Sequence, residues 1–171
     1  YYKNLTDSVK HLIANGNKEW KFFKSWSKED TLKSKLGDSI CVHVLTAGTG
    51  SGCPLYNDSV RVHYLLRILP STSYKDGAII DRSYYGSYNL ETSIPKTLLV
   101  SGLIDGFTTA LMNMHIGDRW VVYMPYDLGY GSSTSNVPAY STLIFDITLA
   151  AYYHAGSSVP VWSAKQTKWT E

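Results

Sequence analysis

The spacing of hydrophobic residues divides the chain into a short N-terminal region of helical pattern and a longer region of alternating pattern. Residues 4–15 place apolar side chains at helical spacing, which predicts an amphipathic helix. The next stretch, KEWKFFKSW, sets aromatic residues among lysines, and Ser27 or Asp30 could cap a second short helix that ends at Gly37. Residues 1–38 are therefore predicted to form a helical or irregular extension, which either packs on the domain or offers a surface to a partner.

From residue 39 the hydrophobic pattern changes to the alternation that is typical of β-strands. Loops rich in Gly, Pro and Asn separate five such segments: SICVHVLTAG, VRVHYLLRIL, KTLLVSGLI, DRWVVYMP and TLIFDITLAAYY. The stretch IIDRSYYGSYNLETSIP is expected to be irregular. Because no βα alternation repeats, we expect an antiparallel five-stranded sheet of the α+β class over residues 39–153. A polar tail follows at residues 154–171.

One short helix is predicted between the strands, in the stretch IDGFTTALMNMHIGDRW. About nine residues is less than an isolated helix needs, so its stability has to come from packing. Four residues form one apolar stripe at positions i, i+3, i+4 and i+7: Phe107, Ala110, Leu111 and Met114. We expect this stripe to lie across the hydrophobic face of the sheet.

Composition narrows the classes of function. The chain has 171 residues and a net charge of +2, with 18% charged residues, and it is long enough for one well-buried domain with an appendage. It contains no block of five Lys and Arg, so nucleic-acid binding is not expected. No run approaches the ~18 apolar residues of a transmembrane segment, so none is expected. The 14 tyrosines, the low charge and the absence of an initial Met leave export to the periplasm or cell envelope open.

The residues that usually carry covalent or metal chemistry form no recognisable motif. Cys41 and Cys53 could pair in an oxidising compartment, or they could be two separate reduced thiols. The five histidines show no metal-ligand spacing on one element, and no nucleophile elbow occurs. We therefore expect neither a metal nor a cofactor.

Five segments, taken in order, carry a family resemblance: VRVHY, DGAIIDRS, LIDGFTTALMNMHIGDRW, MPYDLGYG and VPAYSTLIFDITL. In this order and spacing, residues 41–150 resemble the FKBP-type peptidyl-prolyl cis/trans isomerases. The corresponding family patterns read approximately V-x-V-H-Y-x-G, D-G-x-x-F-D-S-S, V-I-x-G-W-x-x-A-L-x-x-M-x-x-G, P-x-x-x-A-Y-G and I-P-x-x-x-x-L-x-F-x-V-x-L. The resemblance implies an FKBP-like fold, in which the sheet wraps around the short helix, and isomerisation of X-Pro bonds without a cofactor.

The resemblance also implies a pocket and assigns residues to it. Phe107 falls on the family's floor Trp, Tyr130 on the Tyr whose hydroxyl binds a ligand carbonyl, and Asp81 on a wall carboxylate; these three are the predicted catalytic residues. The predicted substrate-binding residues are Tyr64, Ile80, Leu103, Ile104, Val137 and Phe145. Proline-containing polypeptides are the expected partners, and the family also implies macrolide-type ligands.

Several positions depart from the family pattern and leave two functions open. Ile80 stands where the family usually has Phe, Phe107 replaces Trp, and Leu66 replaces Gly. Residues 84–97 do not match, so the family's Arg and Phe pocket residues cannot be assigned. The first hypothesis is an isomerase that acts on exposed X-Pro bonds. The second is a catalytically weak FKBP-fold binding or chaperone module, for which filling of the pocket by Leu66 and Ile80 would be the simplest sign.

Overall fold

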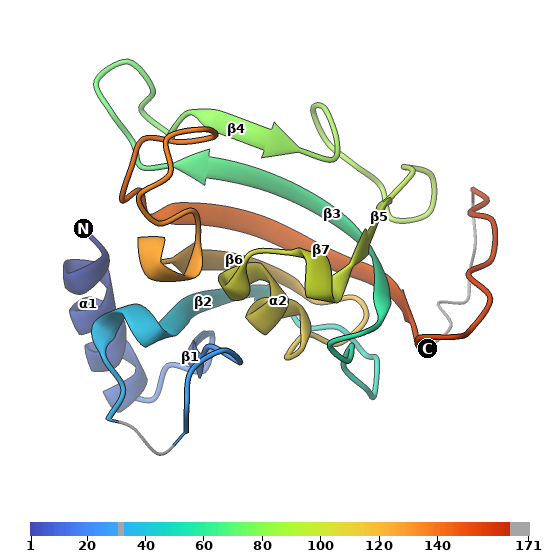
Figure 1. The fold of residues 1–171 in the computed structure, drawn as a ribbon, viewed down its shortest axis with the longest axis horizontal. Helices are drawn as coiled ribbons and strands as arrows, with labels where there is room; N and C mark the ends of the chain where they lie inside the picture. The colour runs from blue at the N-terminus through green and yellow to red at the C-terminus, as the bar shows by residue number, and fades with distance from the viewer. Residues whose placement is uncertain (31–32, 165–171) are drawn as a thin grey trace.

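The computed structural model describes residues 1–30 and 33–164 and confirms the α+β class. The helices are α1 (Tyr2–Ala14) and α2 (Asp105–Leu111), and short 3-10 turns lie at Leu36–Asp38 (η1), Val100–Gly102 (η2) and Tyr126–Leu128 (η3). The strands are β1 (Trp20–Lys24), β2 (Ser39–Thr46), β3 (Ser59–Ile68), β4 (Ile79–Arg82), β5 (Lys96–Leu99), β6 (Arg119–Met124) and β7 (Leu143–Tyr153). Figure 1 shows the long β3 and β7 side by side, with α2 against one face of the sheet.

The strands form one seven-stranded sheet in the order β1-β2-β6-β7-β3-β4, and β5 pairs with the first half of β3. Each pair of neighbouring strands is antiparallel. The predicted number of five strands is therefore wrong, although the five predicted segments contain β2, β3, β5, β6 and β7. The two additional strands are β1 and β4, which lie at the two ends of the sheet order.

Strand β1 occupies the stretch that was expected to be helical or irregular. Its aromatic side chains pack on both faces of the sheet. The sequence of the strand therefore lacks the apolar–polar alternation of a half-buried strand. Phe23 stacks on Trp120 at 5.5 Å between ring centroids and joins the main core. Trp20 points to the other face and stacks on His43 at 4.4 Å. The short helix expected from residue 27 to Gly37 is absent from the described residues 27–30 and 33–35, and residues 31–32 lie outside the described part.

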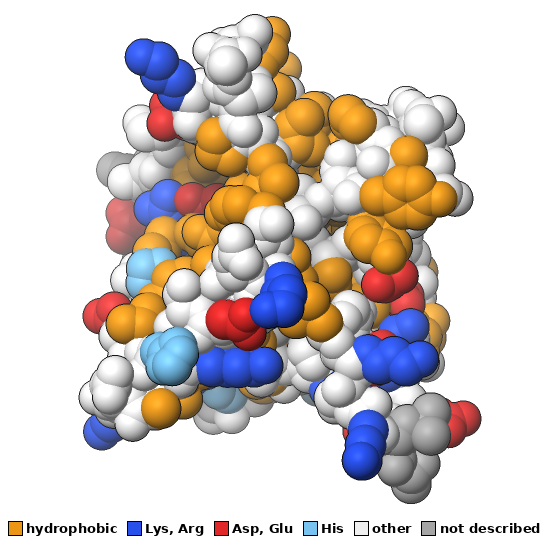
Figure 2. Space-filling view, turned by 90° about the vertical axis from the view of Figure 1, so that its left-hand side faces the viewer, with side chains coloured by type: hydrophobic (Ala, Val, Ile, Leu, Met, Phe, Trp, Pro, Cys, Tyr) orange, Lys and Arg blue, Asp and Glu red, His pale blue; other side chains and the backbone are white. Residues whose placement is uncertain are grey.

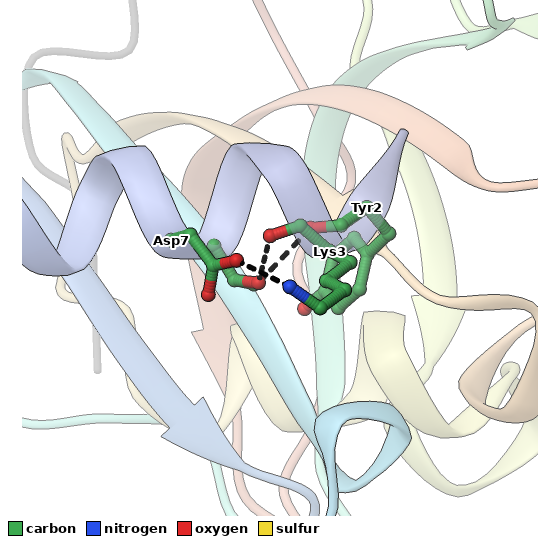
Figure 3. A network of polar contacts seen from close by, with 4 residues as sticks. Tyr2, Lys3 and Asp7 are labelled. Carbon is green, nitrogen blue, oxygen red and sulfur yellow. Dashed lines mark hydrogen bonds and ion pairs between the residues drawn. The ribbon is translucent and has the colours of Figure 1, made fainter.

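Helix α1 covers the face of β1, β2 and β6 that is turned away from the main core. Val9 and Tyr2 pack on Cys41, and the Tyr2 hydroxyl donates to the Ser39 carbonyl at 2.5 Å. Figure 3 shows the first turn of the helix, where the Thr6 hydroxyl donates to the backbone carbonyls of Tyr2 and Lys3. The extension is thus attached to the sheet by a packed helix as well as by a strand.

The cysteines do not form a disulfide with each other. Cys41 is buried beneath α1, and burial raises the pKa of its thiol to about 12. The Cys53 sulfur instead lies 3.5 Å from His115 Nδ1. The alternative of two separate thiols is the one that the structure contains.

The main core lies between α2 and the other face of the sheet. The predicted stripe of α2 is buried there, as expected. Gly106 lets the helix approach β6 closely, because a Cβ at this position would lie 2.6 Å from Met124 Sδ. Seven helical residues are sufficient because the sheet, rather than the helix itself, stabilises the conformation.

The surface shows no segregation of charge on the side drawn in Figure 2. Lys and Arg side chains lie there beside Asp and Glu, and hydrophobic side chains are interspersed among them. No helix in the described residues is long and apolar enough to cross a membrane.

We predict that Leu111→Ala lowers the free energy of unfolding by about 2–5 kcal/mol, because Leu111 is fully buried and the truncation leaves a cavity beneath the sheet. Urea unfolding measures this change. Leu12→Ala, on the exposed side of α1, is the matched control and should change stability by less than about 0.5 kcal/mol. Equal losses in the two variants would contradict the assigned role of α2.

A second prediction concerns His63, which lies on the sheet face opposite α2. Its ring is 1% exposed and stacks on Tyr88 at 4.5 Å, and neither ring nitrogen has a hydrogen-bond partner in the described residues. Burial lowers the pKa of His63, so the unfolded chain binds a proton at higher pH than the folded protein does. The free energy of unfolding should therefore fall as pH drops below about 6.5.

His63→Phe removes this linkage while keeping an aromatic ring. Its urea-unfolding free energy should decline less than that of the wild type between about pH 7 and pH 5. Parallel declines in the two proteins would show that protonation of His63 does not contribute.

Candidate functional site

A pocket of about 310 Å³ opens where β3, β4 and β5 meet the start of α2. It is lined by side chains from strands that are distant in sequence, and by the loop after η3. The lining residues are Tyr64, Asp81, Lys96, Leu98, Gly102, Leu103, Ile104, Phe107, Tyr130 and Phe145. Seven of the nine residues predicted for the site are among them.

Three aromatic rings form one side of the pocket. Phe107, in the first turn of α2, stacks on Phe145 of β7 with centroids 5.0 Å apart and planes 20° apart. The Tyr64 ring meets Phe107 edge-on at 5.8 Å and lies 6.2 Å from Phe145. Each ring is nearly buried and belongs to the main core, so its position is set by the packing of α2 on the sheet. The pocket surface is therefore an extension of the core.

A polar wall adjoins this aromatic surface. The Tyr64 hydroxyl donates to Asp81 Oδ2 at 2.7 Å, and the other carboxylate oxygen of Asp81 accepts from the Arg82 backbone N–H at 2.8 Å. Burial, and then the hydrogen bond to Asp81, raise the pKa of Tyr64 well above its usual range. Tyr64 is thus a protonated donor at neutral pH, and it fixes the direction of the Asp81 carboxylate.

Tyr130 lies on the loop that follows η3. The Gly131 carbonyl accepts from the Tyr140 N–H at 2.8 Å, and the Gly131 N–H donates to the Tyr126 carbonyl at 3.0 Å, which closes the loop on itself. Burial and the negative charge of Asp81 raise the pKa of Tyr130, so its hydroxyl keeps its proton at neutral pH. No residue in the described part of the chain forms a hydrogen bond with this hydroxyl. The pocket therefore contains a protonated donor that is available to a bound molecule.

The backbone at the start of α2 brings Leu103 and Ile104 to the pocket. The Ile104 carbonyl accepts from the N–H groups of Phe107 and Thr108, and the Thr108 hydroxyl donates to the Val100 carbonyl at 2.7 Å. These bonds hold the turn η2 against the helix. They fix the two side chains beside the Phe107 ring.

Two predicted residues do not line the pocket. Ile80 is partly buried on β4, packs on the main core and is not among the residues that line the pocket. Val137 is buried in the same core. Leu66 is buried as well and is not part of the pocket wall. Neither Leu66 nor Ile80 is among the residues that line the pocket, so they do not fill it as the hypothesis of a catalytically weak binding module expected.

Three lining residues were not predicted from the sequence: Lys96, Leu98 and Gly102. Lys96 and Leu98 alternate with Thr97, so the period of a strand could have placed them on one face. The pairing of β5 with the first half of β3 then decides that this face is turned to the pocket.

Comparisons with known proteins identify the family. The sequence model of the FKBP-type peptidyl-prolyl cis-trans isomerases matches residues 50–150, which is more than half of the chain. The chain belongs to this family. A crystal structure of a peptidyl-prolyl cis-trans isomerase from Pseudomonas syringae supports the fold, with a TM-score of 0.58 over 90% of this chain and 97% of that one. At 24% identity, that likeness concerns the fold alone.

Two relatives of this chain are longer than it. A macrophage infectivity potentiator from Trypanosoma cruzi is 33% identical over 124 residues, which are 71% of this chain and 57% of that protein. An FKBP-type 22 kDa peptidyl-prolyl cis-trans isomerase from Escherichia coli is 32% identical over 145 residues, which are 84% of this chain and 58% of that protein. The chain thus spans a little over half the length of these relatives.

We predict that Tyr64→Phe lowers the free energy of unfolding by about 1–2 kcal/mol, because the variant removes a hydrogen bond to a carboxylate and keeps the ring. Thermal or urea unfolding measures the change. Tyr74→Phe, in the exposed turn between β3 and β4, removes a hydroxyl outside the pocket and should have almost no effect. If Tyr64→Phe is as stable as Tyr74→Phe, the link to Asp81 contributes nothing to folding.

Proposed function

We propose that this chain catalyses the cis/trans isomerisation of X-Pro bonds in proline-containing polypeptides, in the pocket around Phe107. The observation that carries the proposal is the combination of an unfilled pocket, an aromatic surface of three rings and an available hydroxyl donor on Tyr130. Membership of the isomerase family supports it.

The chemistry needs no nucleophile, because the barrier is rotational. The X-Pro bond rotates over a barrier of about 18–20 kcal/mol, since the planar amide loses its resonance when it twists. The twisted amide has less charge separation than the planar one. An apolar and dry surface therefore favours the twisted state over the planar one, and so lowers the barrier.

Each group of pocket residues would have a separate role in this isomerisation. The prolyl ring would lie on Phe107 and Phe145, while Leu103 and Ile104 would exclude water from the rotating bond. The Tyr130 hydroxyl would donate to a substrate carbonyl and hold the acyl side still while the prolyl side turns. Asp81 and Tyr64 would keep the wall of the pocket in place. The role of the Tyr130 hydroxyl requires its proton, which is consistent with the raised pKa of Tyr130.

A pure binding or chaperone function is less favoured. In that alternative, the aromatic residues of the extension would be the surface that recognises a partner. Trp20, Phe22 and Phe23 are instead occupied by packing within this chain, and Trp26 is the exposed one of the four, at 45%. The extension consequently offers less recognition surface than its sequence indicates.

The test is a refolding assay in which proline isomerisation limits the rate. The wild type should accelerate refolding of the client, and Tyr130→Phe should lower that catalytic efficiency about three- to tenfold, as expected for one lost hydrogen bond. Tyr1→Phe, an exposed hydroxyl that lies outside this pocket, is the matched control and should keep the wild-type rate.

Phe107→Leu tests the aromatic surface in the same assay. It should reduce the efficiency further than Tyr130→Phe, because a branched aliphatic side chain replaces the ring on which the proline would lie. Circular dichroism checks that each variant is folded. A wild type that does not accelerate refolding, or variants as fast as it, would reject the proposal.

A further inference from the structure

Lys96 is the basic residue of the pocket wall. It lies on β5, and its Nζ donates to the Tyr64 hydroxyl at 3.2 Å and lies 5.5 Å from the centroid of the Tyr64 ring. The other nine residues that line the pocket carry no positive charge. A cation on the polar wall of the pocket, beside the hydroxyl that also binds Asp81, is a feature that rotation of an amide bond does not require.

The ammonium group of Lys96 has N–H donors beyond the one that binds Tyr64. It has three N–H donors, and the Tyr64 hydroxyl takes one of them. No carboxylate in the described residues lies within ion-pair distance of it. The nearby Asp81 carboxylate already accepts from Tyr64 and from the Arg82 backbone. Lys96 can therefore accept an anion from outside without losing an ion pair within the protein.

The distance between the Lys96 ammonium and the aromatic surface decides which residue of a bound substrate the ammonium can contact. The Tyr64 ring contacts both Phe107 and the Lys96 ammonium, so a prolyl ring on Phe107 would lie one ring away from the cation. Neighbouring Cα atoms of a peptide are about 3.8 Å apart, and a Glu side chain extends further by a similar length. A residue directly beside the proline can thus reach Lys96.

We infer that Lys96 is a specificity-determining residue that selects X-Pro substrates with an acidic side chain next to the proline. The inference rests on the proposed isomerase function and names its substrate class. A carboxylate beside the proline would pair with the Lys96 ammonium at the pocket edge. The hydroxyl of Tyr64, bonded to both Lys96 and Asp81, keeps the cation in position.

The experiment compares four short peptides in the presence of the protein. Two carry Glu or Gln immediately before the proline, and two carry Glu or Gln immediately after it. Exchange NMR measures the catalysed cis/trans rate of each peptide, and the quantity of interest is the Glu-to-Gln ratio of catalytic efficiencies at one placement. Using a ratio removes any general effect of a variant on the pocket.

In the wild type the ratio should be about two- to fivefold at one placement at least, which is the range for a solvent-accessible ion pair, and it should decrease as salt is added. Lys96→Met, which keeps the length of the side chain and removes the charge, should bring the ratio to about one. Lys96→Glu should bring it below one. Lys21→Met, on β1 at the other end of the sheet order, is the matched control and should retain the wild-type ratio.

The outcomes separate this inference from the proposed function. If the wild type does not catalyse exchange of any of the four peptides, the isomerase proposal fails. If it catalyses exchange with equal efficiency for Glu and Gln at both placements, or if Lys96→Met keeps the preference, the assignment of Lys96 is wrong while the isomerase function stands.

Discussion

The packing of α2 across the sheet is the contact on which the rest of the structure depends. A helix of seven residues cannot hold its conformation alone, and Phe107, Leu111 and Met114 are all buried against the strands. The same contact fixes the Phe107 ring beside Phe145 and Tyr64. The aromatic surface of the pocket is therefore built from core residues. A change that loosens α2 would affect folding and the pocket together.

The polar wall of the pocket is organised by one hydroxyl group. Tyr64 donates to Asp81 and accepts from Lys96, so it joins an anion and a cation that do not contact each other directly. Its raised pKa keeps the proton in place, which preserves both bonds at neutral pH. This arrangement places a negative and a positive group at the edge of the pocket, each of them hydrogen-bonded to the same hydroxyl.

The N-terminal extension is integrated into the sheet. Strand β1 adds Phe23 to the main core, and α1 closes the other face through Tyr2 and Val9. The stretch KEWKFFKSW was difficult to interpret from sequence because its aromatic side chains pack on both faces of the sheet. The apolar–polar alternation that marks a strand is therefore missing. For the same reason the sequence left open whether these residues pack on the domain or face a partner, and most of them pack within the chain.

The sequence by itself determined the class of fold, five of the seven strands and the apolar stripe of the short helix, because these follow from local periodicity. Ordered motifs also identified most of the pocket, from Tyr64 to Phe145. Only the tertiary structure decided that Ile80 and Val137 belong to the core, and that Lys96 belongs to the pocket. The register of a sheet decides which face of a short strand is turned to the core or to the pocket. For β5 that register is set by pairing with β3, whose residues are distant in the chain, so local sequence does not reveal it.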